Sequence, residues 1–444
     1  MPAPEQHTPL DPGTLPELPP SLTTPAYLYD LAEVRRSHRR LRAALPAPAG
    51  LFYSLKANPH PALLLELRQL GTRPEVCSPG ELAAALDAGW SAAQVLYTGP
   101  AKRDQEVRLA LAHGVRLFSV DSPRAVDQLS RLAAAEDTVA QCLLRVNDDQ
   151  PVPGQGLAMT GVASQFGADV EWILAEPERF SGHPHAEVVG LHLYMGSNLG
   201  AVEDLIGQFA RSLSTARRIG AALSAHGVQL RILDLGGGFG APFARGGQAV
   251  DLTALEPRLA AVLDEQAPGW RDGNPAIVFE SGRYLVGTSG TLITAVVDVK
   301  RSHGRTVVLL ESGINHLGGM SGLRRLTPLI PELLTNDGRD NDIRLDTLVA
   351  GPLCTPLDTW ARSSPLPPLR PDDVVAVPNV GAYGLTASLV AFLGHPLPTE
   401  VVIDSDAPDR QPAISRLELV RSAVADTPFT TSADQRPHHS QGVR

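Results

Sequence analysis

The chain has 444 residues, more than one ordinary compact domain needs, so one large barrel or two domains are expected. Its 43% hydrophobic and 19% charged residues suffice for a full core, and no apolar run is long enough to cross a bilayer. The net charge of -10 argues against nucleic acid as a partner. Three scattered cysteines exclude a disulfide framework, and the first residues lack a secretory signal, so we expect a cytoplasmic protein.

The chain begins and ends with polar stretches, residues 1–24 and 425–444, which we expect to be a disordered N-terminal tail and a flexible C-terminal tail. Between them lie eight short apolar or β-branched runs, and most of the intervals carry apolar residues near the 3.6-residue spacing of a helix. Strand and helix are therefore predicted to alternate. The predicted strands are 51–55, 74–77, 94–97, 117–120, 141–146, 188–194, 231–235 and 276–280.

Eight such βα units predict a (β/α)8 TIM barrel over residues 46–285, with a doubly wound sheet as the alternative. After residue 286 the pattern changes to β-branched segments separated by Pro, Gly and Asp turns, which predicts a C-terminal β domain over residues 286–424. Residues 25–45 begin with AYLYD and continue with a basic helical stretch. We expect this strand and helix to associate with the β domain.

Lysine is rare in this chain, since Lys56, Lys102 and Lys300 are the only lysines among 38 basic residues. A lysine is usually a solvated surface residue. Lys56, however, directly follows the first predicted barrel strand, at the end where the reactive groups of barrel enzymes gather, whereas the other two lie in polar segments. A lysine in such a place can form a Schiff base with a carbonyl group, and we interpret Lys56 as that residue.

The sixth and seventh predicted strands end in HLYMGSN and DLGGGFG, which places Ser197 on the same rim of the barrel as Gly236, Gly237 and Gly238. Glycines allow backbone N–H groups to approach a phosphate, and the rim after strand 7 is a recurrent phosphate site in barrels. The alternative is a dinucleotide fingerprint, but that motif normally opens a Rossmann unit rather than following a seventh strand. The glycine run therefore predicts a ligand that carries phosphate.

The eighth predicted strand ends in FESGRYL and presents Glu280 and Arg283 together. Such a pair could simply form an ion pair or a capped turn. Beside a phosphate-binding rim, however, Arg283 can hold phosphate and Glu280 can keep a heterocyclic nitrogen protonated. An amine-bearing lysine, a phosphate cradle and a carboxylate for a ring nitrogen together indicate pyridoxal 5'-phosphate, which stabilises a carbanion at the carbon bearing the amino group.

Seven motifs, in this order, resemble the fold-type III pyridoxal-phosphate-dependent decarboxylases, the group of diaminopimelate, ornithine and biosynthetic arginine decarboxylases. The resemblance runs from about residue 25 to 420 and implies an alanine-racemase-like barrel followed by a β domain. The motifs are YSLKANP (53–59), CSPGEL (77–82), MGSN (195–198), LGGGFG (235–240), ESGR (280–283), GPLCTPLD (351–358) and GAYG (381–384).

The resemblance implies a role for each residue that matches a family motif. Lys56 is implied to form the Schiff base and Glu280 to pair with the pyridine nitrogen. Cys354 and Asp358 are implied to reach the neighbouring active site of a homodimer, where Cys354 delivers the proton after carbon dioxide leaves. The alternative for Cys354 is a buried, inert thiol. The residues implied around the phosphate are Gly236, Gly237, Gly238, Ser197, Arg283 and Tyr383.

Two departures from the family pattern bear on the site. Tyr194 stands where most relatives have a histidine that stacks on the cofactor ring, with His192 earlier on the same strand face. Thr355 stands where the diamine-forming enzymes usually carry Asp or Glu, so a cationic substrate tail would be desolvated without a partner. With residues 161–167 and 381–402, these features resemble the L-glutamyl-[acyl-carrier protein] decarboxylase-like enzymes of secondary metabolism, which implies a carrier-bound amino acid as substrate.

The leading interpretation is a pyridoxal-phosphate-dependent α-decarboxylase of an amino acid or carrier-bound amino acid. The alternatives are a decarboxylase of free diaminopimelate or another diamino acid, an amino-acid racemase on the same barrel, and a non-catalytic cofactor-binding homologue. The GPLC motif argues against the racemase. Retention of Lys56, Glu280, Arg283 and Cys354 together argues against the non-catalytic homologue.

No metal site is expected. His183 and His185 lie in a proline-containing loop without an accompanying carboxylate cluster, so they are interpreted as solvated side chains. The motifs assign no role to His316.

Overall fold

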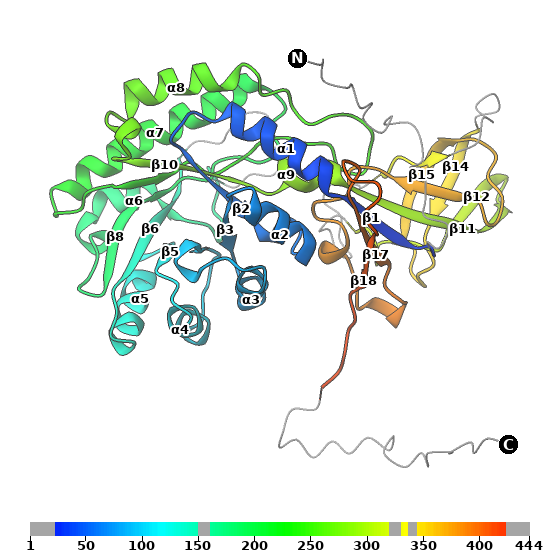
Figure 1. Ribbon diagram of the computed structural model, residues 1–444, viewed down its shortest axis with the longest axis horizontal. Helices are drawn as coiled ribbons and strands as arrows, with labels where there is room; N and C mark the ends of the chain where they lie inside the picture. The colour runs from blue at the N-terminus through cyan, green and yellow to red at the C-terminus, as the bar shows by residue number, and fades with distance from the viewer. Residues whose placement is uncertain (1–22, 150–159, 319–329, 336–343, 423–444) are drawn as a thin grey trace, which may run out of the picture.

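The computed structural model of the chain describes residues 23–149, 160–318, 330–335 and 344–422. These residues form two nine-stranded sheets, one rolled into a barrel and the other beside it (Figure 1). The two predicted tails lie outside the described residues, apart from residues 23 and 24 at the first of them. The predicted fold class, a TIM barrel followed by a β domain, is confirmed.

The barrel is closed by eight parallel strands in the order β5-β4-β3-β2-β10-β9-β8-β6, with β6 pairing back to β5. A short strand, β7 (Ala168–Asp169), pairs with β6 outside this ring. All eight predicted strands are present, with ends that differ by about two residues. They are β2 (Gly50–Ser54), β3 (Arg73–Val76), β4 (Leu96–Tyr97), β5 (Leu117–Val120), β6 (Ala140–Asn147), β8 (Ala186–His192), β9 (Ile232–Asp234) and β10 (Ala276–Ser281).

The strands read as continuous apolar runs because both of their faces are buried. One face points into the barrel, where six strands contribute to a separate buried cluster, while the other packs against the outer helices. This filled interior makes the barrel a packed core, and only the carboxyl ends of the strands are left for polar groups. The inner cluster consists of Phe52, Leu96, Leu117, Leu143, Val189 and Val278.

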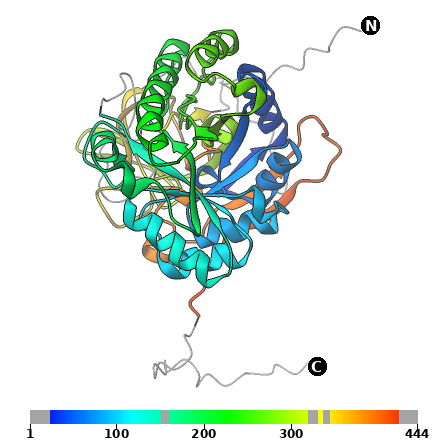
Figure 2. The same ribbon diagram turned by 90° about the vertical axis from the view of Figure 1, so that its left-hand side faces the viewer.

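Helices surround the barrel, as the view along it shows (Figure 2). Several begin at the sequence signals expected of a helix start: α3 and α5 each have a serine N-cap, Ser78 or Ser122, followed by proline at the first helical position. The helices are α2 (Pro61–Gln69), α3 (Pro79–Asp87), α4 (Asp104–Ala112), α5 (Pro123–Ala135), α6 (Val170–Ala175), α7 (Val202–Ser224), α8 (Leu255–Gln266) and α9 (Arg283–Val286).

The second sheet contains the first strand of the described chain. β1 (Ala26–Asp30) lies between β11 (Gly290–Ser302), to which it is antiparallel, and β17 (Thr399–Ile403), to which it is parallel. The AYLYD segment is therefore part of this sheet. The other strands are β12 (Arg305–Leu310), β13 (Leu334–Thr335), β14 (Arg344–Ala350), β15 (Thr359–Leu366), β16 (Val374–Val377) and β18 (Ala413–Arg416).

The helix after β1 differs from the expectation that it associates with the β domain. α1 (Leu31–Ala44) packs against α2 and α9 of the barrel. Its Arg35 forms ion pairs with Glu66 of α2 and with Asp404, which follows β17. The helix therefore joins the two sheets, because its apolar face packs on barrel helices while its charged face reaches the other domain.

Two loops connect the barrel directly to the second sheet. The backbone N–H of Tyr383 donates to the carbonyl of Ala57, 2.7 Å away, and the side-chain amide of Asn58 donates to the carbonyl of Gly381 at 2.9 Å. The loop 55–58 follows β2, and the loop 381–384 follows β16. These bonds hold the GAYG motif against the YSLKANP motif.

The approach of these backbones predicts an effect for Gly381→Ala. A Cβ at Gly381 would lie 1.9 Å from the carbonyl oxygen of Val286, so the backbone must shift to admit it. We expect a loss of about 2 kcal/mol or more in the free energy of unfolding, measured by urea denaturation. Gly207→Ala is the matched control, because a Cβ at this position within α7 meets nothing within 4 Å and alanine is the better helix former. Equal stabilities for the two variants would contradict this account.

Candidate active site

Lys56 lies in a short 3-10 turn (Leu55–Ala57) directly after β2, at the carboxyl end of the barrel. Its Nζ is 3.5 Å from Oε1 of Glu75 and 5.9 Å from the centre of the Tyr194 ring. The Lys56 side chain is 41% exposed, whereas that of Glu75 is 1% exposed. The amine is thus accessible from the rim but is held by a carboxylate fixed in the barrel.

Glu75 is a functional residue that the sequence analysis missed. It lies next to the last residue of β3, and its Oε1 also accepts hydrogen bonds from Thr98 Oγ1 at 2.5 Å and from the Cys77 thiol at 3.4 Å. Burial by itself raises the pKa of Glu75, but Lys56 and these hydrogen bonds lower it below its usual value. Burial by itself lowers the pKa of Lys56, but Glu75, with smaller contributions from Cys77, Tyr383 and Glu280, raises it well above its usual value. Each charge is therefore kept in the barrel by the other.

Six of the predicted site residues line one cavity at this rim. Ser54, Asn198, Phe239, Ser281 and Gly282 complete its wall. Because parallel strands all end on the same face, side chains that are far apart in the sequence meet here. The predicted residues in the cavity wall are Lys56, Tyr194, Gly238, Glu280, Arg283 and Tyr383.

The glycine run after β9 is required by close packing. A Cβ at Gly237 would lie 2.3 Å from the carbonyl of Glu280, and a Cβ at Gly236, whose φ is +68°, would lie 2.9 Å from Tyr194. The amide of the buried Gln208 on α7 donates to the carbonyl of Gly237. These contacts fix the loop with its backbone close to the cavity, as a phosphate cradle needs.

Ser197 lies beside this loop, half-buried, in the segment between β8 and α7. Its neighbour Leu199 donates a backbone hydrogen bond to the carbonyl of Gly238, 2.8 Å away. The adjacent Asn198, which has a φ of +57°, lines the cavity and accepts a hydrogen bond from the N–H of Ala241. The structure thus brings the two predicted rim loops together.

Arg283 and Tyr383 come from different domains and contact each other in the cavity wall. The guanidinium carbon lies 4.8 Å from the centre of the tyrosine ring. Tyr383 has a φ of +56°, which is unusual for a side chain of this size and is held by its hydrogen bond to Ala57. The second sheet therefore contributes to the barrel site through a constrained backbone position.

A buried cluster of three titratable groups lies at the floor of the site. His192 ends β8, Asp234 ends β9 and Glu280 lies in β10, and one ligand atom of each falls within 4.8 Å of the others. Nε2 of His192 is 3.4 Å from Oε1 of Glu280, and neither atom makes a hydrogen bond with any described residue. Nδ1 of His192 is 2.9 Å from Oγ of Ser119, which gives His192 a place that the motifs did not predict.

Burial controls the charge of this cluster. It raises the pKa of Asp234 to about 7, although the N–H of Gly236 and a hydrogen bond with Glu280 oppose the shift. Burial, together with Glu75 and Asp234, raises the pKa of Glu280 well above its usual value. Burial lowers the pKa of His192. One histidine and two carboxyl groups are also a donor set that suits a divalent cation, so the absence of a metal stays a prediction.

The GPLCTPLD loop lies between β14 and β15 and does not contribute to the lining of this cavity. Cys354 is exposed. Thr355 is half-buried, and its hydroxyl oxygen accepts the N–H of Leu357 at 3.3 Å. Neither residue therefore lines this cavity in its own chain.

Asp358, which the resemblance implies to bind substrate across a dimer interface, has a buried place in its own chain. Its side chain is only 2% exposed, and its two carboxylate oxygens accept the backbone N–H groups of Ile314 and Leu353, each at 2.8 Å. A carboxylate buried in this way fixes the loop that carries Cys354. The family motif indicated that the position matters, but only the fold shows what it contacts.

His316 also has a structural place. Its Nε2 donates to the carbonyl of Pro396 at 3.0 Å, so its Nδ1 accepts from the hydroxyl of Ser312 at 3.1 Å. Burial lowers the pKa of His316 to about 4, which keeps the ring neutral. The bond to Pro396 joins two distant loops of the second domain, while the bond to Ser312 is local, and His316 does not line the cavity.

The geometry agrees with what comparison with known proteins shows. A family model described as "Pyridoxal-dependent decarboxylase, pyridoxal binding domain" matches residues 31–287, more than half of the chain. The chain belongs to the pyridoxal-dependent decarboxylases. It is therefore a carboxy-lyase that uses pyridoxal phosphate to decarboxylate amino acids, and the resemblance drawn from its motifs is confirmed.

Relatives match this decarboxylase along nearly its whole length. It is 31% identical over 397 residues to the L-glutamyl-[BtrI acyl-carrier protein] decarboxylase of Niallia circulans, covering 88% of this chain and 92% of that protein. It is 30% identical to the diaminopimelate decarboxylase of Methanothermobacter thermautotrophicus, covering 87% and 88%. The crystal structure of Helicobacter pylori diaminopimelate decarboxylase with L-lysine has a TM-score of 0.75 and 25% identity, covering 89% and 94%.

The residues around Lys56 fit pyridoxal phosphate. The rim offers a glycine loop held close to the cavity and the cation of Arg283, both suited to phosphate. The floor offers the buried Oε1 of Glu280, which has no hydrogen-bond partner among the described residues and could accept one from a ring nitrogen.

No described helix is long and apolar enough to span a membrane.

The raised pKa of Asp234 predicts how the stability of the apoprotein depends on pH. Between the ordinary pKa of 3.8 and about 7, folded Asp234 keeps a proton that the unfolded chain has released. The free energy of unfolding therefore contains a contribution that falls as the pH rises through this range. Asp234→Asn removes that contribution. We expect the stability difference, wild type minus variant, to decrease between pH 5 and pH 7.5 in urea denaturation.

Asp409→Asn, a change at an exposed aspartate, is the matched control. It keeps the same chemical substitution but removes no buried carboxyl group. A difference for Asp234→Asn that stays constant with pH, or that changes no more than for Asp409→Asn, would contradict the assigned electrostatics.

Proposed function

We propose that this decarboxylase acts on an amino acid tethered to an acyl-carrier protein, with tethered glutamate as the first substrate to test, and that it works as a cytoplasmic homodimer with shared active sites. The observation that carries the proposal is Thr355, an uncharged residue next to Cys354. A carrier thioester is neutral at the distal end of the substrate, so it needs no carboxylate partner there. The name of the Niallia circulans relative supports the same substrate class.

Each residue has a defined task in this proposal. When bound, the cofactor supplies an electron sink for the electron pair of the bond between the α carbon and the carboxylate. Lys56 holds the cofactor through its amine and yields to the substrate amine, and Glu75 sets the charge of Lys56. Glu280 accepts a hydrogen bond from the ring nitrogen, and the aromatic ring of Tyr194 covers one face of the pocket.

The remaining tasks concern phosphate binding and proton delivery. Arg283 and Tyr383 bind the phosphate together with the loop of Gly236, Gly237 and Gly238, and Ser197 lies next to that loop. Cys354 of one subunit delivers a proton to the α carbon in the other subunit. The exposed Leu357 beside it, at 49%, supports a subunit contact at this loop.

A substrate panel tests the proposed reaction. Carrier-tethered glutamate, free glutamate, diaminopimelate and ornithine are incubated with the holoenzyme in deuterated water and analysed by mass spectrometry. We expect loss of carbon dioxide and gain of one deuterium for tethered glutamate. Efficient turnover of a free diamino acid, with none of the tethered substrate, would contradict the proposal. Gain of one deuterium by a substrate that keeps its carboxylate would indicate a racemase instead.

Subunit mixing tests the shared site. Lys56→Ala and Cys354→Ala are each expected to lower activity by at least a hundredfold, because each removes a group that acts on the reacting atoms. When the two inactive variants are mixed and allowed to exchange subunits, about a quarter of the sites regain both residues. We therefore expect about a quarter of wild-type activity. No recovery, with subunit exchange verified by native mass spectrometry, would place Cys354 outside the partner's site.

A further inference from the structure

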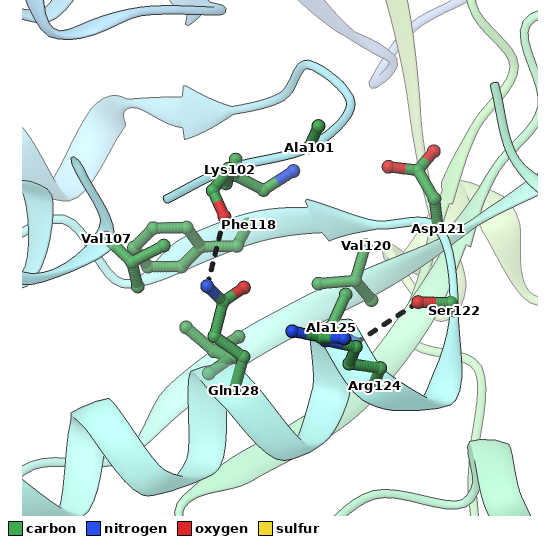
Figure 3. A pocket seen from close by; sticks show the side chains of 11 residues that line it. Ala101, Lys102, Val107, Phe118, Val120, Asp121, Ser122, Arg124, Ala125 and Gln128 are labelled. Carbon is green, nitrogen blue, oxygen red and sulfur yellow. Dashed lines mark hydrogen bonds between the residues drawn. The ribbon is translucent and has the colours of Figure 1, made fainter. Parts of the chain in front are cut away.

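A second cavity, of about 340 Å³, opens at the same end of the barrel as the site of Lys56. It lies between the loop after β4, the end of β5 and the helices α4 and α5 (Figure 3). This volume is in the range of small-ligand pockets. Its floor is apolar and buried, and is formed by Val107, Phe118, Val120 and Leu129.

The rim of this cavity is cationic. Lys102 and Arg124 lie on it, opposed by the single carboxylate of Asp121. Oδ1 of Asp121 already accepts the N–H of Gly167 at 2.9 Å, whereas Arg124 is paired with no carboxylate among the described residues. In a chain with a net charge of -10, a pocket with an excess of positive charge indicates an anionic ligand.

The rim is fixed before any ligand binds. The side-chain amide of Gln128 on α5 donates to the carbonyl of Lys102 at 3.0 Å and to Asp104, at the start of α4, at 2.8 Å. The ammonium group of Lys102 donates to the carbonyl of Gly99. An ammonium group has three donors, so Lys102 keeps capacity for an anion. Burial lowers its pKa, which means that an added anion would also relieve the cost of its desolvation.

The cavity is close to the chemistry but separate from it. β4, whose following loop carries Lys102, is two strands from β2, which carries Lys56. Neighbouring strands are about 4.8 Å apart, so the two strand ends are about 10 Å apart. The charge of Lys102 is also among the causes that lower the pKa of His192 on the floor of the active site. A flexible arm anchored at the cavity could therefore extend its end to Lys56.

We infer that this cavity binds the phosphopantetheine arm of the carrier protein. Lys102 and Arg124 contact the phosphodiester, and the apolar floor contacts the adjoining carbon that bears two methyl groups. An anion attached directly to a branched apolar segment matches a cationic rim above an apolar floor. The inference rests on the proposed carrier-tethered substrate and names the part of that substrate that is recognised away from the reacting carbon.

Two synthetic substrates test this inference, the glutamyl thioesters of pantetheine and of 4'-phosphopantetheine. With wild-type holoenzyme we expect the phosphate to lower KM by about tenfold and to leave kcat unchanged. In Arg124→Ala this gain should disappear, while turnover of the thioester without phosphate stays at the wild-type level. Lys102→Met should also lose the gain, and Arg124→Lys should recover part of it.

Arg108→Ala is the matched control, because Arg108 lies on α4 beside the cavity but is exposed and does not line it. It should keep the full gain. Calorimetry with 4'-phosphopantetheine, and separately with inorganic phosphate, measures binding without catalysis. Tighter binding of phosphopantetheine, lost in Arg124→Ala, supports the assignment.

Three results overturn the inference in distinguishable ways. Equal KM values for the two thioesters would show that the cavity does not recognise the phosphate of the substrate, but they would leave the proposed function intact. Equal binding of inorganic phosphate and phosphopantetheine reduces the cavity to a general anion site. Turnover of neither thioester, with turnover of a free diamino acid, refutes the proposed function and the inference together.

Discussion

The charge balance at the centre of the barrel is the constraint on which the site depends. Glu75, Asp234 and Glu280 are almost fully buried at the carboxyl ends of three strands, where isolated carboxylates would be very costly. Glu75 stays ionised because Lys56 and hydrogen-bond donors compensate it, whereas burial favours the neutral forms of the other two. The site therefore contains Glu75, a carboxylate suited to pair with the amine of Lys56. It also contains Glu280, a carboxyl group suited to pair with a cationic ring nitrogen.

The two sheets are interdependent around this centre. Tyr383 reaches the barrel from the second sheet because its backbone N–H is bonded to Ala57, one residue after Lys56. β1 begins the described chain yet pairs with β11 and β17, and α1 then returns to pack on the barrel. The second sheet therefore contains a strand from the start of the described chain, and the barrel rim receives Tyr383 from the loop after β16, where it contacts Arg283.

The position of Cys354 shows how a reactive residue can lie outside its own site. The loop is held by the buried Asp358, so that Cys354 is presented at the surface. In the proposed dimer this exposed thiol completes the site of the other subunit. The proposed arm-binding cavity lies beside β5 and the loop after β4 of the barrel. In this proposal, Cys354 acts on the reacting end of the substrate near Lys56, and the cavity binds the phosphate at the other end of the arm.

The sequence by itself determined the eight barrel strands, the following β domain and six residues of the cavity wall, because buried parallel strands read as apolar runs and their ends carry the motifs. It did not single out Glu75 or Asp234, since a lone acidic residue at a strand end has no distinguishing pattern until the barrel closes. It also did not show the buried backbone contacts of Asp358, and it left His192 and His316 without roles. Only the tertiary structure decided these, because burial and hydrogen-bond partners are set by contacts between segments far apart in the chain.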